Sequence, residues 1–445
     1  MTQPSTQSRS PAAPRGLFYG WVLVGVSALV MILGTVPLFQ GMTAWFVVLE
    51  QQFGWSRTQL SIAFSLTRVE GSIMGPISGY LTDHLGPRRM VMTGMLVAGG
   101  GFLLMSRMQH LWQFYLAFVV ISVGVGLGTW LPMFTVLNNW FVRHRAMAMA
   151  LAIEGFLVGG VILVPLLAWA IDPDAPGRLG WRNTAMLVGI VIMVAAIPLS
   201  RLVRNAPEPY GLHPDGRAPA NTATSGGTTP ADANEPSYTW QEAIRTKTFW
   251  LIAMGHACSS IIPTTMMVHL GPMLDDRSFS LPTVGWVVAT YTGVAAVFTL
   301  VGGYIGDRLP IRFALFSFAA IQSVAVAVLL VTESLPMVYV FALILGVGFG
   351  GRNPLTAAIR GVYFGRKAFA SITGISTMPQ NILLLVAPLF AGIMFDATGS
   401  YTIPLATVAV VSLAGSALFL LLGDPARAPS QQAKPTADVP TKIAA

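Results

Sequence analysis

The chain has 445 residues, of which 54% are apolar and 10% are charged, whereas an ordinary soluble domain carries roughly 25% charged residues. Together with the mean hydropathy of +0.65, this composition excludes a soluble globular protein, a collagen and a disordered scaffold. The single cysteine, Cys258, excludes an intrachain disulfide and a metal site built from several cysteines, and we expect no cofactor. The formal net charge of +8 is compatible with nucleic-acid binding only if the basic residues cluster suitably.

Charged residues divide the chain into twelve apolar runs, each long enough for a helix that crosses about 30 Å of hydrocarbon. We predict helices because backbone groups find no water inside a bilayer. The approximate limits are 17–49, 58–82, 90–106, 111–142, 146–171, 183–200, 248–274, 278–306, 313–332, 334–359, 368–395 and 397–423. The first run follows Arg15 and lacks a small-residue cleavage site, which predicts a retained helix with a cytoplasmic start. The sequence therefore predicts an all-α, multi-pass protein of the cell membrane, in a bacterium the inner membrane, with both termini in the cytoplasm.

The distribution of basic residues agrees with this orientation. Of the 26 Lys and Arg residues, nineteen fall on the predicted cytoplasmic side, and this set includes Arg360 at the end of the tenth run. Five fall outside, and two, Arg68 and Arg352, lie inside helices. This bias is the positive-inside rule. Topology thus explains the net charge, and we expect a lipid bilayer and not nucleic acid as the partner.

Two homologous six-helix halves are predicted from an internal repeat. The segment Gly79–Asp83 returns as Gly303–Asp307 at an offset of 224, and Arg88 returns as Arg312. Glycines 124, 126 and 128 return as 346, 348 and 350 at an offset of 222. We assign residues 1–15 to a disordered N-terminus, 16–201 to the first half, 202–244 to a flexible linker, 245–423 to the second half and 424–445 to a disordered tail.

The segment Gly79-Tyr-Leu-Thr-Asp-His-Leu-Gly-Pro-Arg-Arg89 resembles the signature between helices two and three of the major facilitator superfamily. With the repeat and the linker, this resemblance covers nearly the whole chain. Tyr19-Gly20-Trp21 and the segment Trp140–Ala146 are similar to the monocarboxylate porter and oxalate/formate antiporter group. The membrane lysines and the helix-eight arginine on which that group relies for anions are absent. The resemblance implies a transporter that works by alternating access and functions as a monomer.

The signature predicts a conformational switch. Gly79 permits a close helix approach, and the Asp83 carboxylate is expected to meet the positive N-terminal end of another helix. The resemblance implies that this partner is helix eleven, opening near Ala368, and that the contact latches the outward-open state. Arg88 and the counterparts Asp307 and Arg312 complete the predicted switch. The alternative is that these charges only reflect the positive-inside topology.

Four charges lie inside the predicted spans: Arg68, Glu70, Glu154 and Arg352. Each costs roughly 2.5 to 3.5 kcal/mol unless it is paired or faces water. Arg352 is expected to clamp a substrate carboxylate, or else to be satisfied by carbonyls or by Glu154. Arg68 is interpreted as a structural or gating ion pair, or as a substrate contact. Glu154 is the first candidate for proton coupling and Glu70 the second, and a permanent salt bridge with an arginine is the alternative for Glu154.

The helices that line the central path in this superfamily are one, four, seven and ten. Here they offer Gln40, Trp130, His256 and Asn353 as candidate substrate-binding residues. His256 either binds substrate, carries a proton, or is merely hydrogen-bonded to the backbone. Pro37 and Pro263 interrupt helices one and seven at corresponding places and point towards the site.

Three functions remain open from the sequence. The first is transport of a small organic anion, a carboxylate, together with a proton. The second is efflux of a larger or neutral compound, although the Gly155–Gly160 stretch does not reproduce the Gly-Pro signature of drug antiporters. The third is a membrane sensor on a transporter scaffold. An enzyme is not expected, because the spans contain no metal-ligand cluster and no nucleophile with a base.

Overall fold

The computed structural model describes residues 18–55, 57–171, 179–216, 237–277, 281–332 and 334–425, and the regular elements in these ranges are helices. The first half contains α1 (Tyr19–Thr35), the π-helix η1 (Val36–Gln40), α2 (Met42–Phe53), α3 (Arg57–Leu85), α4 (Pro87–Arg107), α5 (Leu111–Gly128), α6 (Trp130–Trp140), α7 (Arg145–Ile171) and α8 (Gly180–Leu202). The short turns η2 (Glu208–Tyr210) and η3 (Pro214–Gly216) follow. The second half contains α10 (Trp240–Ile244), α11 (Lys247–Ser259), α12 (Ile261–Asp276), α13 (Leu281–Gly306), α14 (Ile311–Leu330), α15 (Leu335–Phe364), α16 (Phe369–Ser376), α17 (Met378–Thr398), α18 (Thr402–Ala417) and η4 (Leu418–Leu421).

The twelve predicted spans correspond to single helices or to consecutive helices in the described ranges. Five spans consist of consecutive elements, namely α1–η1–α2, α5–α6, α11–α12, α16–α17 and α18–η4. Eleven helical segments among the described residues are long and apolar enough to cross a membrane. The remaining span, α3, is too polar by that measure, yet its 29 residues extend about 43 Å at 1.5 Å per residue. The prediction of an all-α fold with twelve membrane helices in two halves is confirmed.

Both halves contain an interrupted helix at corresponding positions. Helix one widens into the π-helix at Val36–Gln40, which contains Pro37, and the Trp45 indole donates a 2.9 Å hydrogen bond to the Pro37 carbonyl. Helix seven breaks at Ser260, between α11 and α12, and not at Pro263. Pro263 lies in the first turn of α12, where an N–H has no intrahelical partner, so the proline ring is tolerated there.

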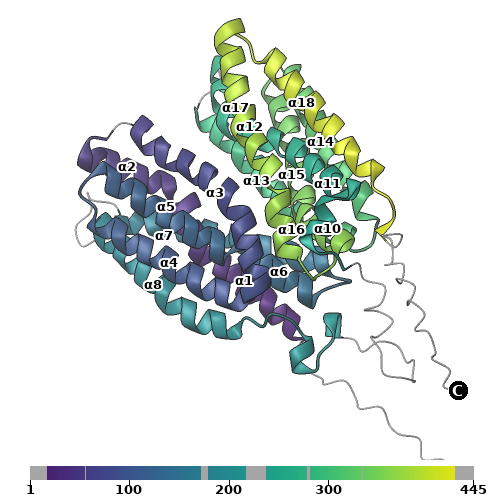
Figure 1. Ribbon diagram of the computed structural model, residues 1–445. Coiled ribbons are helices and arrows are strands. Elements are labelled where there is room, and N and C mark those ends of the chain that lie inside the picture. Colours follow the sequence, from purple (N-terminus) through teal and green to yellow (C-terminus); the bar gives the residue numbers. More distant parts are fainter. Residues whose placement is uncertain are drawn as a thin grey trace, which may run out of the picture.

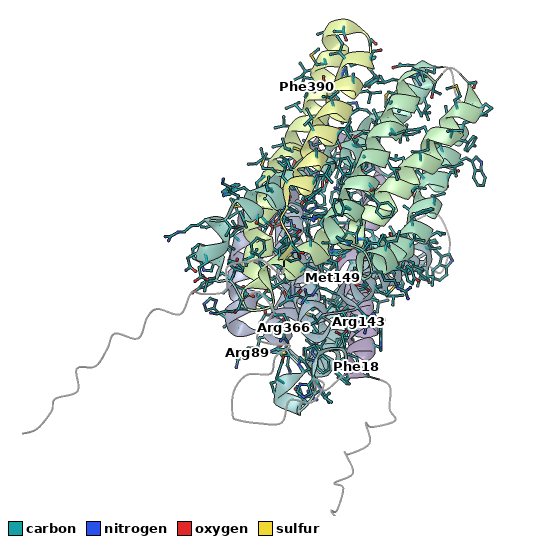
Figure 2. The ribbon with its side chains drawn as sticks, turned by 90° about the vertical axis from the view of Figure 1, so that its right-hand side faces the viewer. Phe18, Arg89, Arg143, Met149, Arg366 and Phe390 are labelled. Carbon is teal, nitrogen blue, oxygen red and sulfur yellow. The ribbon has the colours of Figure 1, made fainter. Side chains whose placement is uncertain are left out.

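The two halves meet at one end of the molecule and spread apart towards the other (Figure 1). We call the end where they meet the closed end and the opposite end the open end. Arg89, Arg143 and Arg366 lie at the closed end, whereas Phe390 lies near the open end (Figure 2). Any site between the halves is therefore approached from the open end.

Part of the segment assigned to a flexible linker is ordered at the closed end. Residues 204–216, which we call the strap, follow α8 directly. The Trp140 indole donates to the Arg204 carbonyl at 2.9 Å, and the Asn205 side chain accepts from the Arg88 N–H at 2.9 Å. The strap thus satisfies polar groups at helix ends, which its composition alone did not reveal. The N-terminus to residue 17, residues 217–236 and the tail from 426 lie outside the described residues.

Candidate functional site

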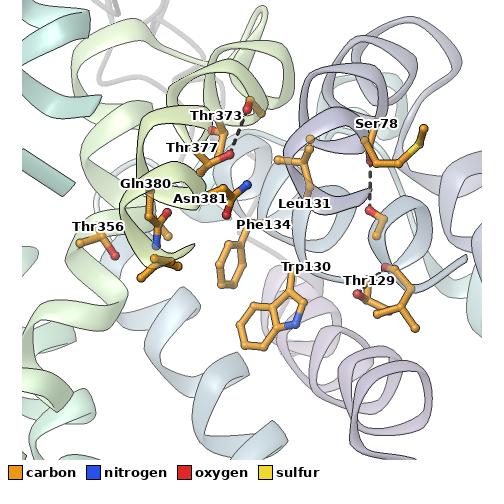
Figure 3. Close-up of a pocket in the computed structure, with 18 of the residues that line it drawn as sticks. Ser78, Thr129, Trp130, Leu131, Phe134, Thr356, Thr373, Thr377, Gln380 and Asn381 are labelled. Carbon is orange, nitrogen blue, oxygen red and sulfur yellow. Dashed lines mark hydrogen bonds between the residues drawn. The ribbon is translucent and has the colours of Figure 1, made fainter. Parts of the chain in front are cut away.

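A cavity of about 620 Å³ lies between the two halves. The first half contributes residues of η1, α3, α5, α6 and α7, and the second half contributes residues of α11, α15, α16 and α17. Figure 3 shows Trp130 and Phe134 on one side of this cavity, with Thr356, Gln380 and Asn381 facing them from the other half. A cavity shared by both halves is the place where relative movement of the halves changes access to a bound molecule.

Arg360 on α15 supplies positive charge to the cavity wall. Its Nε donates to the Ser376 hydroxyl at 2.5 Å, Nη1 donates to the Thr356 carbonyl, and Nη2 lies 2.8 Å from His256 Nδ1. A guanidinium has five N–H donors, so these bonds leave one N–H on each terminal nitrogen. Two N–H groups of one guanidinium are able to bind the two oxygens of a carboxylate. Among the described residues, no carboxylate lies within ion-pair distance of Arg360.

His256 on α11 positions Arg360. A guanidinium cannot accept a hydrogen bond, so His256 Nδ1 must be the acceptor of the 2.8 Å contact. The ring is therefore unprotonated at Nδ1, with its proton on Nε2. The backbone carbonyl of His256 also accepts from the hydroxyls of Ser259 and Ser260, at 3.1 and 2.7 Å. His256 also lines the cavity, where the sequence had placed it as a candidate substrate-binding residue. Its bond to Arg360 was not expected.

The structure places Arg352 away from the cavity, which corrects the expectation that it lines the central path. Its side chain is buried, and Nη1 donates to the hydroxyls of Ser259 and Ser260 at 2.6 and 3.1 Å. No contact with Glu154 is present among the described residues. On an α-helix, four residues turn a side chain by about 40°, so Arg360 points about 80° away from Arg352. That rotation brings Arg360 and not Arg352 to the cavity.

Arg360 was missed because the sequence assigned it to the cytoplasmic loop after the tenth run. In the structure, α15 continues to Phe364 and the Arg360 side chain is only 2% exposed. The signal that points to it is the series Arg352, Thr356 and Arg360, in which each step of four residues turns the side chain by about 40° around the helix.

Glu70 on α3 lines the cavity from the first half. The Ser122 hydroxyl on α5 donates to its Oε2 at 2.6 Å, and its Oε1 is buried without a hydrogen-bond partner among the described residues. A carboxyl that lines the cavity and has one oxygen without a partner among the described residues is able to exchange a proton or to accept a bond from a ligand.

Glu154 on α7 does not line the cavity. It bonds to the Thr299 side chain of α13, at an interface between the two halves, and its Oε1 has no partner among the described residues. The sequence placed Glu154 ahead of Glu70 as the proton-coupling residue. The structure instead brings Glu70 to the cavity and leaves Glu154 between helices.

Other predicted site residues divide into two groups. Trp130 and Asn353 line the cavity. The Trp130 ring packs edge-on against Phe134 and Phe156, with centroids 5.5 and 5.2 Å apart. The side chains of Gln40 and Arg68 lie outside the described part of the structure.

At the closed end, Asp83 meets the N-terminus of α16, the first segment of helix eleven. The backbone N–H groups of Ala370 and Ser371 donate to its two carboxylate oxygens, at 3.2 and 2.8 Å. A Cβ on Gly79 would lie 2.5 Å from the Ala370 carbonyl oxygen, so only glycine permits this approach. The expected contact between Asp83 and helix eleven is present, while its role in transport stays a prediction.

Asp307 makes the corresponding contact in the repeat. It follows α13 and accepts from the N–H groups of Ala146 and Met147, at 2.8 and 3.1 Å, where α7 begins. Burial raises the pKa of this carboxyl from 3.8 to about 6, against the lowering effect of the two N–H groups. Each half thus places a carboxylate on a helix N-terminus of the other half, where the helix dipole favours negative charge.

The two arginines of the predicted switch do not join these carboxylates. The Arg312 guanidinium donates to the Leu422 carbonyl and lies 4.8 Å from the centre of the Phe313 ring. Arg88 contributes its backbone N–H to Asn205, and among the described residues it forms no ion pair with Asp83. The helix N-termini already satisfy both carboxylates, which leaves the arginines to other partners.

Comparison with known proteins identifies the family. The profile of the Major Facilitator Superfamily matches residues 28–274 and 257–445, which together span most of the chain. The chain belongs to this superfamily. Its fold of two six-helix halves around a shared cavity agrees with that assignment. Because the family and the matched relatives are transporters, this member of the superfamily is a transporter and not an enzyme.

Several relatives match along nearly their full length. The chain is 26% identical to monocarboxylate transporter 13 of Rattus norvegicus over 416 residues, which cover 91% of this chain and 89% of the relative. It is 22% identical to monocarboxylate transporter 2 of Homo sapiens, over 91% of this chain and 85% of the relative. An uncharacterized MFS-type transporter of Bacillus subtilis is 22% identical over 83% of this chain and 87% of the relative. The predicted resemblance to the monocarboxylate group is confirmed.

Proposed function

We propose that this transporter carries an organic monocarboxylate across the cytoplasmic membrane by alternating access, as a monomer and together with a proton. The observation that carries the proposal is Arg360, which lines a cavity shared by both halves and has N–H groups beyond those in its bonds to Ser376, Thr356 and His256. A buried guanidinium without a described counter-charge favours an anion over a neutral ligand. The names of the mammalian relatives, monocarboxylate transporters 13 and 2, support a carboxylate.

The positive-inside distribution supports a cytoplasmic closed end, with both chain termini on that side. Under this orientation the structure is outward-open. The contacts of Asp83 with α16 and of Asp307 with α7 support two halves that part at the closed end during the cycle. Because Asp83 and Asp307 each bind the other half, both contacts must break when the cavity opens inward.

We place the coupled proton on Glu70. This carboxyl shares the cavity with Arg360, so its charge and the charge of a bound anion influence each other. The neutral form of Glu70 removes a negative charge that would oppose a carboxylate. Binding of the proton therefore favours binding of the substrate, which is the linkage that symport requires.

The test is uptake of labelled monocarboxylates into proteoliposomes, with and without an imposed pH gradient. We expect saturable uptake that the gradient drives above equilibrium. Glu70→Gln should abolish this accumulation yet retain exchange of substrate for substrate, because exchange releases no net proton. Glu154→Gln is the matched control and should still accumulate substrate. Loss of accumulation in the Glu154 variant alone would move the proton site to the interface of α7 and α13.

A further inference from the structure

The cavity has two chemically different walls. The second half supplies hydrogen-bonding groups, among them Arg360, His256, Asn353, Thr356, Gln380 and Asn381. The first half supplies mainly apolar surface, in which Phe39, Met74, Trp130, Leu131 and Phe134 take part. Figure 3 shows this opposition for the labelled residues, with Trp130 and Phe134 across from Thr356 and Gln380. A ligand that satisfies both walls must itself have a polar end and an apolar body.

Trp130 and Phe134 form an aromatic surface that is already arranged for a ring. Their planes meet at 80° with centroids 5.5 Å apart, and the Phe156 ring also packs edge-on against Trp130, at 72°. Both side chains are half-buried, so ring surface remains accessible from the cavity. Aromatic pairs favour such edge-to-face arrangements, and the ring of a ligand would extend the same packing.

The size of the cavity points in the same direction. Its 620 Å³ would hold about 20 waters at about 30 Å³ each. An acid of two or three carbons would leave most of this space filled with water. It would also make no contact with the aromatic wall. Cavities of roughly 300 to 1,000 Å³ are typical for drug-sized ligands, which are larger than an acid of two or three carbons.

We propose that the preferred substrate is an aromatic monocarboxylate, with its carboxylate on Arg360 and its ring against Trp130 and Phe134. This inference rests on the proposed function and names the substrate class of the same site. The charges of the cavity restrict the class further. Among the described lining residues Arg360 is the one guanidinium or ammonium group, so a second carboxylate on the substrate would be buried without a counter-charge. Dicarboxylates are therefore poor substrates.

The first experiment measures competition against a labelled monocarboxylate in proteoliposomes. The competitors are 3-phenylpropionate, pyruvate, 3-phenylpropanol and phenylsuccinate. Burial of the phenyl group should give 3-phenylpropionate about a tenfold to hundredfold advantage over pyruvate. The alcohol, which lacks the carboxylate, and the dicarboxylate should both compete at least about tenfold more weakly than 3-phenylpropionate.

The second experiment assigns the ring contact to its residues. Trp130→Leu should reduce the ratio of phenylpropionate to pyruvate affinity at least about fivefold, since the aromatic face is lost. Phe134→Leu serves as an independent variant if the packing of Trp130 on Phe156 proves necessary for folding. Trp286→Leu is the matched control, because Trp286 is 68% exposed on α13 and should leave the ratio unchanged.

The outcomes separate the two proposals. If pyruvate competes as well as 3-phenylpropionate, or if neither cavity variant changes the ratio, the aromatic substrate class is wrong while carboxylate transport stands. If 3-phenylpropanol competes as well as the acid, the carboxylate contact with Arg360 is wrong. If no monocarboxylate is transported or competes, the proposed function itself fails.

Discussion

Arg352 and Arg360 lie on the same helix but have different surroundings. Arg352 is held by two serine hydroxyls outside the cavity, whereas Arg360 keeps two N–H groups beyond its bonds to Ser376, Thr356 and His256. A lysine provides a point charge and not a planar fork. The two positions therefore form a natural pair for testing where the anion binds.

We predict that Arg360→Lys lowers the affinity for carboxylate substrates about tenfold to a hundredfold, the loss expected for a charge-assisted bidentate contact. Arg352→Lys should change affinity less than about threefold, because an ammonium can still reach a hydroxyl. Substrate-induced thermal stabilisation in detergent measures both. An affinity loss in the Arg352 variant without one in the Arg360 variant would contradict this assignment of roles.

At the scale of helices, the closed end depends on carboxylates at helix N-termini. Asp307 has a pKa of about 6 in this contact, above its ordinary 3.8, because burial outweighs the two backbone bonds. The positive charge of His144 lowers this pKa and the nearby Asp215 raises it. Between pH 3.8 and about pH 6, Asp307 is more fully protonated when the closed end is formed than when the residue is exposed to water. Its stability relative to the open arrangement therefore falls as pH rises through this range.

We predict that the fraction of molecules with the closed end formed decreases from about pH 3 to about pH 7, most steeply between the two pKa values, and is constant above. Asp307→Asn should flatten this part of the profile, since the amide does not titrate. Pulsed spin-label distances across the closed end, measured in wild type and variant at each pH, provide the check. A profile that is identical in both proteins would assign the pH dependence to another group.

At the scale of the whole molecule, the strap joins the two halves. The Asp215 carboxylate accepts from the N–H groups of Val142 and Arg143 at 3.1 and 2.7 Å, just before α7. Asp215 adopts φ 56°, a left-handed conformation that aspartate tolerates better than most residues. From this anchor on the first half, Glu208 reaches Arg366 of the second half at 2.5 Å.

We predict that Glu208→Gln shifts the equilibrium towards parting of the closed end about twofold to fivefold, the range for a partly exposed ion pair. Arg366→Gln should act in the same direction with a larger effect, because Arg366 also donates to the Asn139 carbonyl. Both shifts should be larger at low salt. The double variant should add little beyond the stronger single change. Fully additive shifts in the same spin-label experiment would show that the two residues act separately.

The sequence by itself determined the twelve spans, the repeat and the signature at Gly79 and Asp83. A bilayer acts on each segment separately, so hydropathy and charge along the chain are sufficient to locate spans. The signature is similarly local, because a glycine and a carboxylate four residues apart mark one helix end that another helix approaches.

Only the tertiary structure decided which charges face the cavity. The rotation of α15 about its axis brings Arg360 to the cavity and turns Arg352 away, and the same kind of packing favours Glu70 over Glu154. The strap likewise packs against the closed end through single polar contacts, and such contacts leave no periodic pattern in the sequence. A helix's rotation and its neighbours are fixed by side-chain packing between segments far apart in the chain, which hydropathy does not encode.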